Sequence, residues 1–286
     1  MSIRVQSPHD LDGYFDSPED CPTKWLLMLR AYIDESGHEA KNWMFLAGYY
    51  RSCDHWEQFV SAWKEGLGPQ RKSLHMSTLR WNKDRTKRLL AKLGPIPERC
   101  GLTGMLGGVK FSDYEDLVTG TPAARQLKGY MICLFPIVLQ TLKALPHNER
   151  IELVFEQQNE YEPFVNMALP GLTVPDRHAP WLMTSDGLPK LAKWGFVPKG
   201  TTIMGDPADY LAFALREAWT DKTSKKAKWC RPILSQGSGE GMGAILSRKT
   251  IRHIISSTYM LGFLEKFDRT MAELYRDGIA ARGIAE

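Results

Sequence analysis

Cysteine is scarce in this 286-residue sequence, and its few cysteines form no recognisable pattern. They show neither a CxxC pair nor the Cys/His spacing of a zinc-binding module, and their number is odd. A disulfide framework and a zinc knuckle are therefore not expected, and a reducing cytoplasm is the setting that this usage favours. The five cysteines are Cys21, Cys53, Cys100, Cys133 and Cys230.

The sequence also lacks a membrane-spanning segment and a signal peptide. The most apolar helical run, Tyr130 to Leu142, is too short to cross a bilayer and contains Pro136. Residues 1–20 are polar and acidic, whereas a signal peptide combines a positive segment with an apolar one. We therefore expect a soluble cytoplasmic protein without a membrane partner.

A strong excess of charge of one sign is absent as well. The formal net charge is +4, with 24% charged and 43% hydrophobic residues, which is the composition of an ordinary globular protein. A charge this small does not by itself indicate a nucleic-acid partner. The length allows one large domain with insertions or two small domains.

The sequence does contain an alternation of strand and helix patterns. Strands are expected at about residues 26–33, 43–50, 101–111 and 151–155, with shorter ones near 180–184 and 201–204. Helices are expected at about residues 54–67, 83–93, 122–144, 206–219 and 249–275. This order predicts an α/β protein with a mixed sheet flanked by helices. We expect residues 1–24 to form a lead-in and residues 25–286 a single domain, in which residues 221–286 are a C-terminal helical extension.

Three acidic residues lie at the ends of these elements. Asp34 ends an apolar strand, Glu156 follows the apolar run 151–155, and Asp209 lies early in the 206–219 helix at the edge of its buried face. A carboxylate at the edge of a core needs a partner, and Mg²⁺ or Mn²⁺ ions take oxygen ligands of this kind. Two such ions can support phosphodiester cleavage. The plainer alternatives are a polar turn after a strand and acidic side chains that favour the start of a helix.

Three motifs, in this order, resemble a bacterial family catalogued as domain of unknown function 3800, which is assigned to the ribonuclease-H-like superfamily. The motifs are Tyr32-Ile33-Asp34-Glu35-Ser36-Gly37, Leu74-His75-Met76 and Ala208-Asp209-Tyr210-Leu211-Ala212. The resemblance covers roughly residues 26–220. It implies a ribonuclease-H-like mixed five-stranded sheet flanked by helices, with acidic residues at one edge that bind divalent metal for phosphodiester hydrolysis or strand transfer.

The sequence departs from the family pattern at two positions. Members often carry Gln-x-Ala-Asp in the late motif, where this chain has Asp206; followed by Pro207, Asp206 has the features of a helix cap. Many members have Asp at the position of Glu156. Because the longer side chain of Glu would move the ion, Glu160 is a rival for the same role. His75 is either a histidine at the edge of the core or a group that orients a phosphate or transfers a proton.

A basic segment late in the chain is the candidate nucleic-acid surface. Its cations could contact phosphates and its tryptophan could stack on an unpaired base, although a solvated basic surface is an equal alternative. The residues are Lys222, Lys225, Lys226, Lys228, Trp229 and Arg231. The glycine-rich stretch 236–243 lacks the Lys-Ser/Thr ending of a phosphate-binding loop, so we expect a flexible loop there.

Together these observations predict a metal-dependent nuclease that uses Mg²⁺ or Mn²⁺. Asp34, Glu156 and Asp209 are the predicted metal ligands, and Glu35 and His75 complete the predicted catalytic residues. A role in phage defence or in mobile elements follows from the resemblance alone. Two alternatives remain: a non-catalytic module that binds nucleic acid or a nucleotide, and a structural protein that binds a partner or a second copy through the apolar 249–275 helix. The sequence does not distinguish DNA from RNA, or endonuclease from exonuclease.

Overall fold

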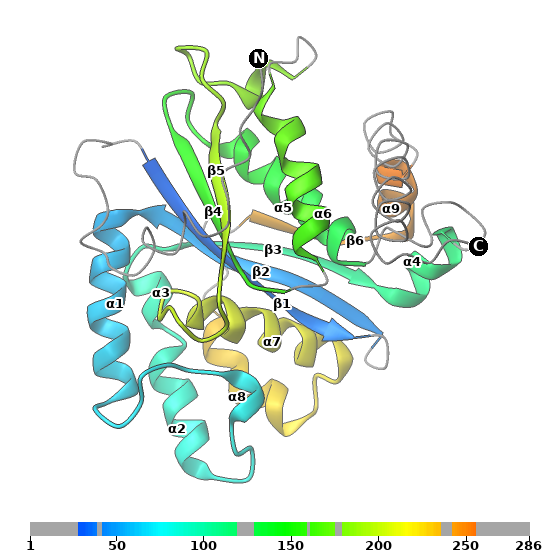
Figure 1. Ribbon diagram of the computed structural model, residues 1–286. Helices are drawn as coiled ribbons and strands as arrows, with labels where there is room; N and C mark the ends of the chain where they lie inside the picture. Colours follow the sequence, from blue (N-terminus) through cyan, green and yellow to red (C-terminus); the bar gives the residue numbers. More distant parts are fainter. Residues whose placement is uncertain are drawn as a thin grey trace, which may run out of the picture.

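The protein is built around a six-stranded mixed sheet with the strand order β5-β4-β1-β2-β3-β6 (Figure 1). The computed structural model describes residues 28–38, 42–118, 129–158, 161–174, 179–235 and 242–255. The strands are β1 (Met28–His38), β2 (Trp43–Ser52), β3 (Thr103–Lys110), β4 (Arg150–Glu156), β5 (Leu191–Val197) and β6 (Met242–Leu246). β2 runs antiparallel to β1 and β3, whereas the β1–β4, β4–β5 and β3–β6 pairs are parallel. The predicted mixed α/β architecture is confirmed.

Helices cover both faces of this sheet. They are α1 (Cys53–Leu67), α2 (Asp84–Leu93), α3 (Ile96–Arg99), α4 (Phe111–Val118), α5 (Gly129–Ala144), α6 (Glu162–Ala168), α7 (Asp206–Thr220), α8 (Lys225–Leu234) and α9 (Arg248–Ile255). Short 3₁₀ turns occur at η4 (Met76–Thr78), η6 (Leu169–Thr173) and η7 (Pro180–Leu182). None of the helices in the described ranges is both long and apolar enough to cross a membrane.

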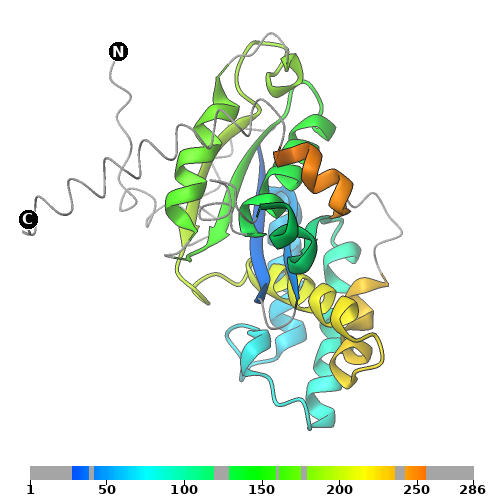
Figure 2. The ribbon, with the colours of Figure 1, turned by 90° about the vertical axis from the view of Figure 1, so that its right-hand side faces the viewer.

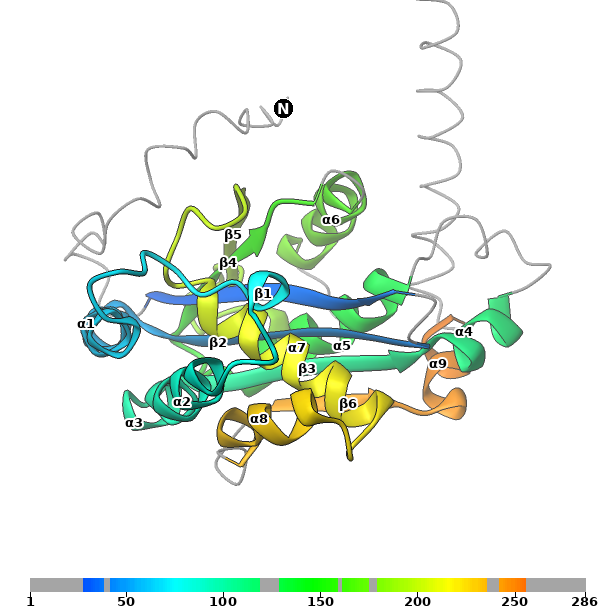
Figure 3. The same ribbon diagram turned by 90° about the horizontal axis from the view of Figure 1, so that it is seen from below.

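Side-chain alternation along β1 divides its residues between two hydrophobic cores. Ile33 packs into the core formed with α5 and α6, whereas its neighbour Tyr32 packs into the core formed with α1, α2, α7 and α8. The two groups of helices lie on opposite sides of the sheet (Figure 2). Figure 3 looks onto the second face and shows α7 crossing the strands. Helix α7 packs directly on β1 and β2, so its first turn is held against the middle of the sheet.

The predicted count of five strands is wrong, because β6 adds a sixth strand beside β3. β6 occupies residues 242–246 inside the segment predicted to be a helical extension, and two of those residues had been assigned to a flexible loop. Its five residues, which include Gly243, are too few to show strand periodicity in the sequence. The remainder of that predicted loop, residues 236–241, lies outside the described residues.

The predicted last strand at residues 201–204 is also wrong, since these residues form turns and β5 lies earlier, at Leu191–Val197. Lys193 and Gly195 interrupt the apolar pattern of β5 and hide it in the sequence. The short strand expected near residues 180–184 is instead η7 followed by an isolated bridge between Met183 and Pro189.

Several other expectations fall partly or wholly on residues that are not described. The lead-in 1–24 and the predicted C-terminal helix beyond residue 255 lie outside the described residues, as does the start of the predicted 122–144 helix. Cys100, Cys133 and Cys230 are buried free thiols. Cys53 is disulfide-bonded, a bond that the absence of a disulfide framework in the sequence did not indicate.

Candidate acidic active site

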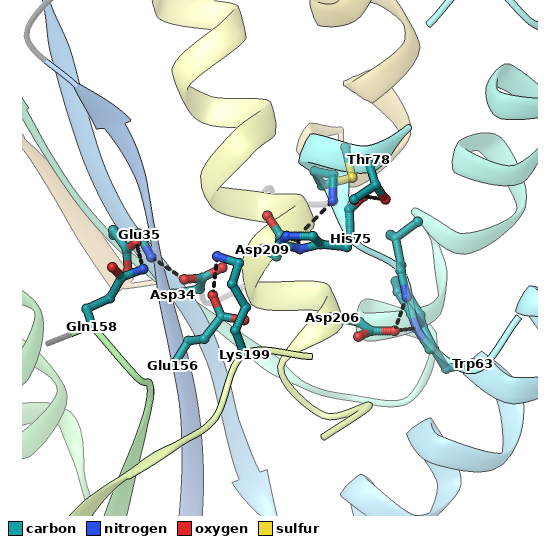
Figure 4. A network of polar contacts seen from close by, with 12 residues as sticks. Asp34, Glu35, Trp63, His75, Thr78, Glu156, Gln158, Lys199, Asp206 and Asp209 are labelled. Carbon is teal, nitrogen blue, oxygen red and sulfur yellow. Dashed lines mark hydrogen bonds and ion pairs between the residues drawn. The ribbon is translucent and has the colours of Figure 1, made fainter. Parts of the chain in front are cut away.

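A pocket lies where β1, β4, the first turn of α7 and the loop after β5 meet. Asp34 of β1, Glu156 of β4 and Asp209 of α7 line it together with His75 (Figure 4). The parallel register pairs Ile33 with Phe155. Asp34 and Glu156 are the next residues on these two neighbouring strands. The structure therefore brings together the three predicted metal ligands and the predicted auxiliary histidine.

Asp34 is the most deeply buried of these carboxylates, with 4% of its surface exposed. Burial raises the pKa of Asp34 well above its ordinary value, and the negative charges of Glu35, Glu156 and Asp209 raise it further. Its Oδ1 accepts a 2.8 Å hydrogen bond from the backbone N–H of Glu35, whereas Oδ2 accepts none from the described residues. Ionised Asp34 therefore needs a positive partner on its pocket side.

Lys199 is a cation at this pocket that the sequence analysis missed. Its Nζ donates a 2.6 Å hydrogen bond to Oε2 of Glu156, and Figure 4 shows the ammonium beside the carboxylates of Glu156 and Asp34. Burial lowers the pKa of Lys199, but the hydrogen bond to Glu156 and the charge of Asp34 outweigh that effect and raise it overall. A single lysine between Pro198 and Gly200 looks like an ordinary turn residue, so only the fold identifies it.

Asp209 and His75 form the opposite side of the pocket. Oδ2 of Asp209 lies 2.9 Å from His75 Nδ1 and accepts a 2.9 Å hydrogen bond from the backbone N–H of Met76. The hydrogen bond to Asp209 raises the pKa of His75, although partial burial opposes it. Oδ1 of Asp209 accepts no hydrogen bond from the described part of the chain, so one oxygen positions the histidine and the other remains available for a ligand.

Asp206 does not cap its helix, and that interpretation of the sequence is wrong. Gly205 occupies the N-cap position. Oδ2 of Asp206 instead accepts a 2.9 Å hydrogen bond from Trp63 Nε1 and a 2.7 Å hydrogen bond from Leu74 N. Burial raises the pKa of Asp206 to about 7. Through these two hydrogen bonds Asp206 connects the start of α7 to α1 and to the residue before His75.

Glu35 does not line the pocket, although it was predicted to assist catalysis there. It follows Asp34 on the same strand and so points to the other face of the sheet, where its Oε1 accepts a hydrogen bond from Gln158 Nε2. Burial raises the pKa of Glu35 to about 7. Glu160, the rival of Glu156, lies outside the described residues.

The pocket suits a hard divalent cation in charge and in donor type, but its carboxylates are not gathered around one point. Oδ2 of Asp34, Oε1 of Glu156 and Oδ1 of Asp209 accept no hydrogen bond from the described residues. Carboxylate oxygens of this kind are the preferred ligands of Mg²⁺ and Mn²⁺. Within the described ranges, however, no three Asp, Glu, His or Cys side chains are arranged to hold one metal ion. The donors are therefore of the right chemical kind for such an ion, while Lys199 holds one oxygen of Glu156 in the structure.

The predicted nucleic-acid surface on α8 is exposed at its cations but not at its tryptophan. The side chains of Lys222, Lys225, Lys228 and Arg231 are exposed, and Lys226 is half-buried. Trp229 is only 8% exposed and packs beside Trp81, with 6.2 Å between ring centroids. The nearby Trp219 is 39% exposed, and Lys222 Nζ lies 5.9 Å from its ring centroid. Trp219, which the sequence pattern did not indicate, is thus more exposed than Trp229.

Comparison of the chain with protein-family models, with curated proteins and with solved structures found no match.

Proposed function

We propose that the protein hydrolyses phosphodiester bonds of nucleic acid with the help of a divalent metal ion. The observation that carries this proposal is that Asp34, Glu156 and Asp209, from two strands and a helix, line one pocket. Asp34 is hard to ionise there, first because it is buried and also because the neighbouring carboxylates repel its charge. Such a concentration of negative charge favours a divalent cation as counter-ion.

The sequence motifs and the sheet support the same proposal. Strands β5-β4-β1-β2-β3 form a mixed five-stranded unit with acidic residues at one position on its face, as the resemblance to the ribonuclease-H-like superfamily implies. In this proposal β6 is an addition at the edge of that unit. A ribonuclease-H-like assignment remains part of the proposal.

The residues of the pocket have separate tasks in the proposed reaction. Asp34, Glu156 and Asp209 would hold Mg²⁺ or Mn²⁺, which when bound supplies Lewis-acid stabilisation of the phosphate and activation of water. His75 holds its Nδ1 proton against Asp209, which leaves Nε2 to exchange a proton with water or with the leaving oxygen. Glu35 acts on this site through Asp34, whose pKa its negative charge raises.

The direct test is cleavage of labelled DNA and RNA, single- and double-stranded, with Mn²⁺, Mg²⁺ or EDTA. The wild type is compared with Asp34→Asn and Asp209→Asn, and with Asp84→Asn, which removes an exposed carboxylate on α2. We expect metal-dependent cleavage by the wild type and the α2 variant, reduced at least about 100-fold in the pocket variants. Undiminished cleavage by a double Asp34→Asn, Asp209→Asn variant would falsify the proposed site.

The second candidate is a non-catalytic module that binds nucleic acid or a nucleotide. The bond between Lys199 and Glu156 favours it, because the pocket already contains a cation and is partly neutralised without a metal. Such a module would bind oligonucleotides equally well in EDTA and would tolerate Asp34→Asn. Calorimetry in the presence and absence of Mn²⁺ separates this candidate from the nuclease.

A further inference from the structure

The position of Lys199 points to a second property of the acidic pocket. Its ammonium donates a 2.6 Å hydrogen bond to Glu156 and lies beside Asp34, two of the three proposed metal ligands (Figure 4). An ammonium and a divalent cation both seek these oxygens, and two cations at one position repel each other. Binding of the ammonium to these carboxylates should therefore weaken their affinity for the divalent cation, and the reverse.

We propose that Lys199 is a built-in counter-ion that exchanges with the divalent metal. Without metal, Lys199 pairs with Glu156 and offsets only part of the negative charge around Asp34; a divalent cation held by Asp34, Glu156 and Asp209 would take its place. This inference rests on the proposed function, because it concerns the same pocket.

The location of Lys199 makes such an exchange feasible. Lys199 belongs to the turn between β5 and α7, and 46% of its side chain is exposed. Gly200, the next residue, has φ 70°, a conformation that glycine adopts without strain. Because nearly half of the side chain already faces solvent, the ammonium can turn outward without disturbing the core.

A second lysine–glutamate pair provides a matched control. Lys193 Nζ of β5 lies 3.0 Å from Oε1 of Glu152 of β4, so both pairs have their glutamate on β4. Glu152 also binds Arg30 and, unlike Glu156, does not line the pocket. Loss of Lys193 removes the same kind of contact without removing the proposed competitor of the metal.

The test is calorimetric titration of the full chain with Mn²⁺, comparing the wild type with Lys199→Met, Lys199→Arg and Lys193→Met. Mutually exclusive binding predicts that Lys199→Met lowers the Kd for Mn²⁺ at least about fivefold, the lower end of ordinary coupling between sites. Lys199→Arg, which keeps the charge, and Lys193→Met should both stay within about twofold of the wild type. Thermal unfolding should agree: Lys199→Met gains a larger increase in Tm from Mn²⁺ than the wild type.

Two results overturn the exchange. If Lys199→Met leaves the Kd unchanged or raises it, Lys199 does not compete with the metal. If neither the wild type nor Lys199→Met binds Mn²⁺, there is no ion to exchange. The cleavage assay separates this inference from the proposed function. If Lys199→Met binds Mn²⁺ more tightly but no form of the protein cleaves nucleic acid, the exchange is supported and the nuclease function is rejected. If the protein cleaves nucleic acid with metal but Lys199→Met has the same Kd for Mn²⁺ as the wild type, the nuclease function is supported and the exchange is rejected.

Discussion

Nδ1 of His75 lies 2.9 Å from Oδ2 of Asp209, although 134 residues separate them in the sequence. The contact is reinforced on both sides of His75, because Leu74 N donates to Asp206 and Met76 N donates to Asp209. The first turn of α7 therefore fixes three successive residues, and with them the position of the imidazole at the pocket.

The hydrogen bond to Asp209 should be visible in the titration of His75. Because this bond raises the pKa of His75, its imidazole should titrate above the ordinary value of about 6.5. Asp209→Asn should lower that pKa. An NMR titration of the histidine ring protons measures both values, with His55, which contacts Ser52 instead, as the signal that the substitution should leave unaffected. An unchanged His75 titration in the variant would contradict the contact.

The same contact has a consequence for stability. A histidine whose pKa is higher in the folded protein stabilises the fold fully below its unfolded pKa, and this contribution is lost as the pH rises through the folded value. His75→Gln should therefore lower the free energy of unfolding at pH 5.5 more than at pH 8.5. Urea unfolding at the two pH values measures the difference.

The contribution of Asp206 to the free energy of unfolding should change with pH in the direction opposite to that of an ordinary aspartate in an ion pair. Its pKa of about 7 lies above the unfolded value, so the folded state binds its proton more tightly, and its contribution to stability falls between about pH 4 and pH 7. Asp206→Asn keeps an oxygen to accept from Trp63 and Leu74 but cannot ionise. As the pH rises through this range, the free energy of unfolding of the wild type should therefore fall by up to about 4 kcal/mol more than that of the variant. Urea unfolding at pH 4.5 and pH 7.5 tests this, and identical pH profiles would contradict it.

Asp34→Asn should make the metal-free protein more stable. At pH 8 the substitution removes a buried carboxylate that its neighbours repel, while the amide oxygen can still accept from Glu35 N. Replacement of a strained functional residue commonly raises stability by about 1–2 kcal/mol, which corresponds to about 2–6 °C in Tm. Scanning calorimetry in EDTA provides the measurement.

The matched control for this prediction is Asp84→Asn. Asp84 is exposed in the first turn of α2, where a negative charge favours the helix dipole. Its removal should lower stability by about 0.3–1 kcal/mol. A lower Tm for Asp34→Asn in EDTA would mean that the pocket tolerates the charge of Asp34 without a metal.

The sequence was sufficient to locate the acidic residues because each lies beside a strong periodic pattern. Apolar runs marked β1 and β4, and the stripe of α7 marked the face that Asp209 adjoins, so the ends of these elements were predictable. Contacts between distant segments were not. Nothing in the sequence shows that Lys199 reaches Glu156 or that Asp206 accepts from Trp63, because these contacts depend on how the loops fold over the sheet.

The misassigned residues have equally local causes. Adjacent positions on a strand face opposite ways, so the run Asp34-Glu35 cannot place both carboxylates in one pocket. A strand of five residues such as β6 carries too little periodicity to be recognised. The lysines around Trp229 in the sequence make it a candidate for base stacking, yet α8 turns it inward and leaves Lys225 and Lys228 exposed.

The exposed cations of α8 should govern the salt dependence of any nucleic-acid binding. A Lys225→Ala, Lys228→Ala double variant should weaken binding to single-stranded oligonucleotides of every sequence. It should also reduce the slope of log K against log salt by about 1.4, since each phosphate contact contributes about 0.7. Lys143→Ala, Lys249→Ala removes two exposed cations on other helices and is the control. Equal slopes for all three proteins would exclude α8 from the interface.

The two tryptophans near α8 should respond to substitution in different ways. Trp229 is 8% exposed in the core, so Trp229→Ala should lower the free energy of unfolding by about 3–5 kcal/mol. Trp219, at 39% exposed beside Lys222, should tolerate alanine with little loss of stability. If single-stranded nucleic acid stacks at this surface, Trp219→Ala should weaken its binding by about 1–3 kcal/mol. Leu188→Ala, which shortens another exposed apolar side chain, should leave binding unchanged. Urea unfolding and fluorescence anisotropy measure the two effects separately, and unaltered binding by Trp219→Ala would restrict the surface to phosphate contacts.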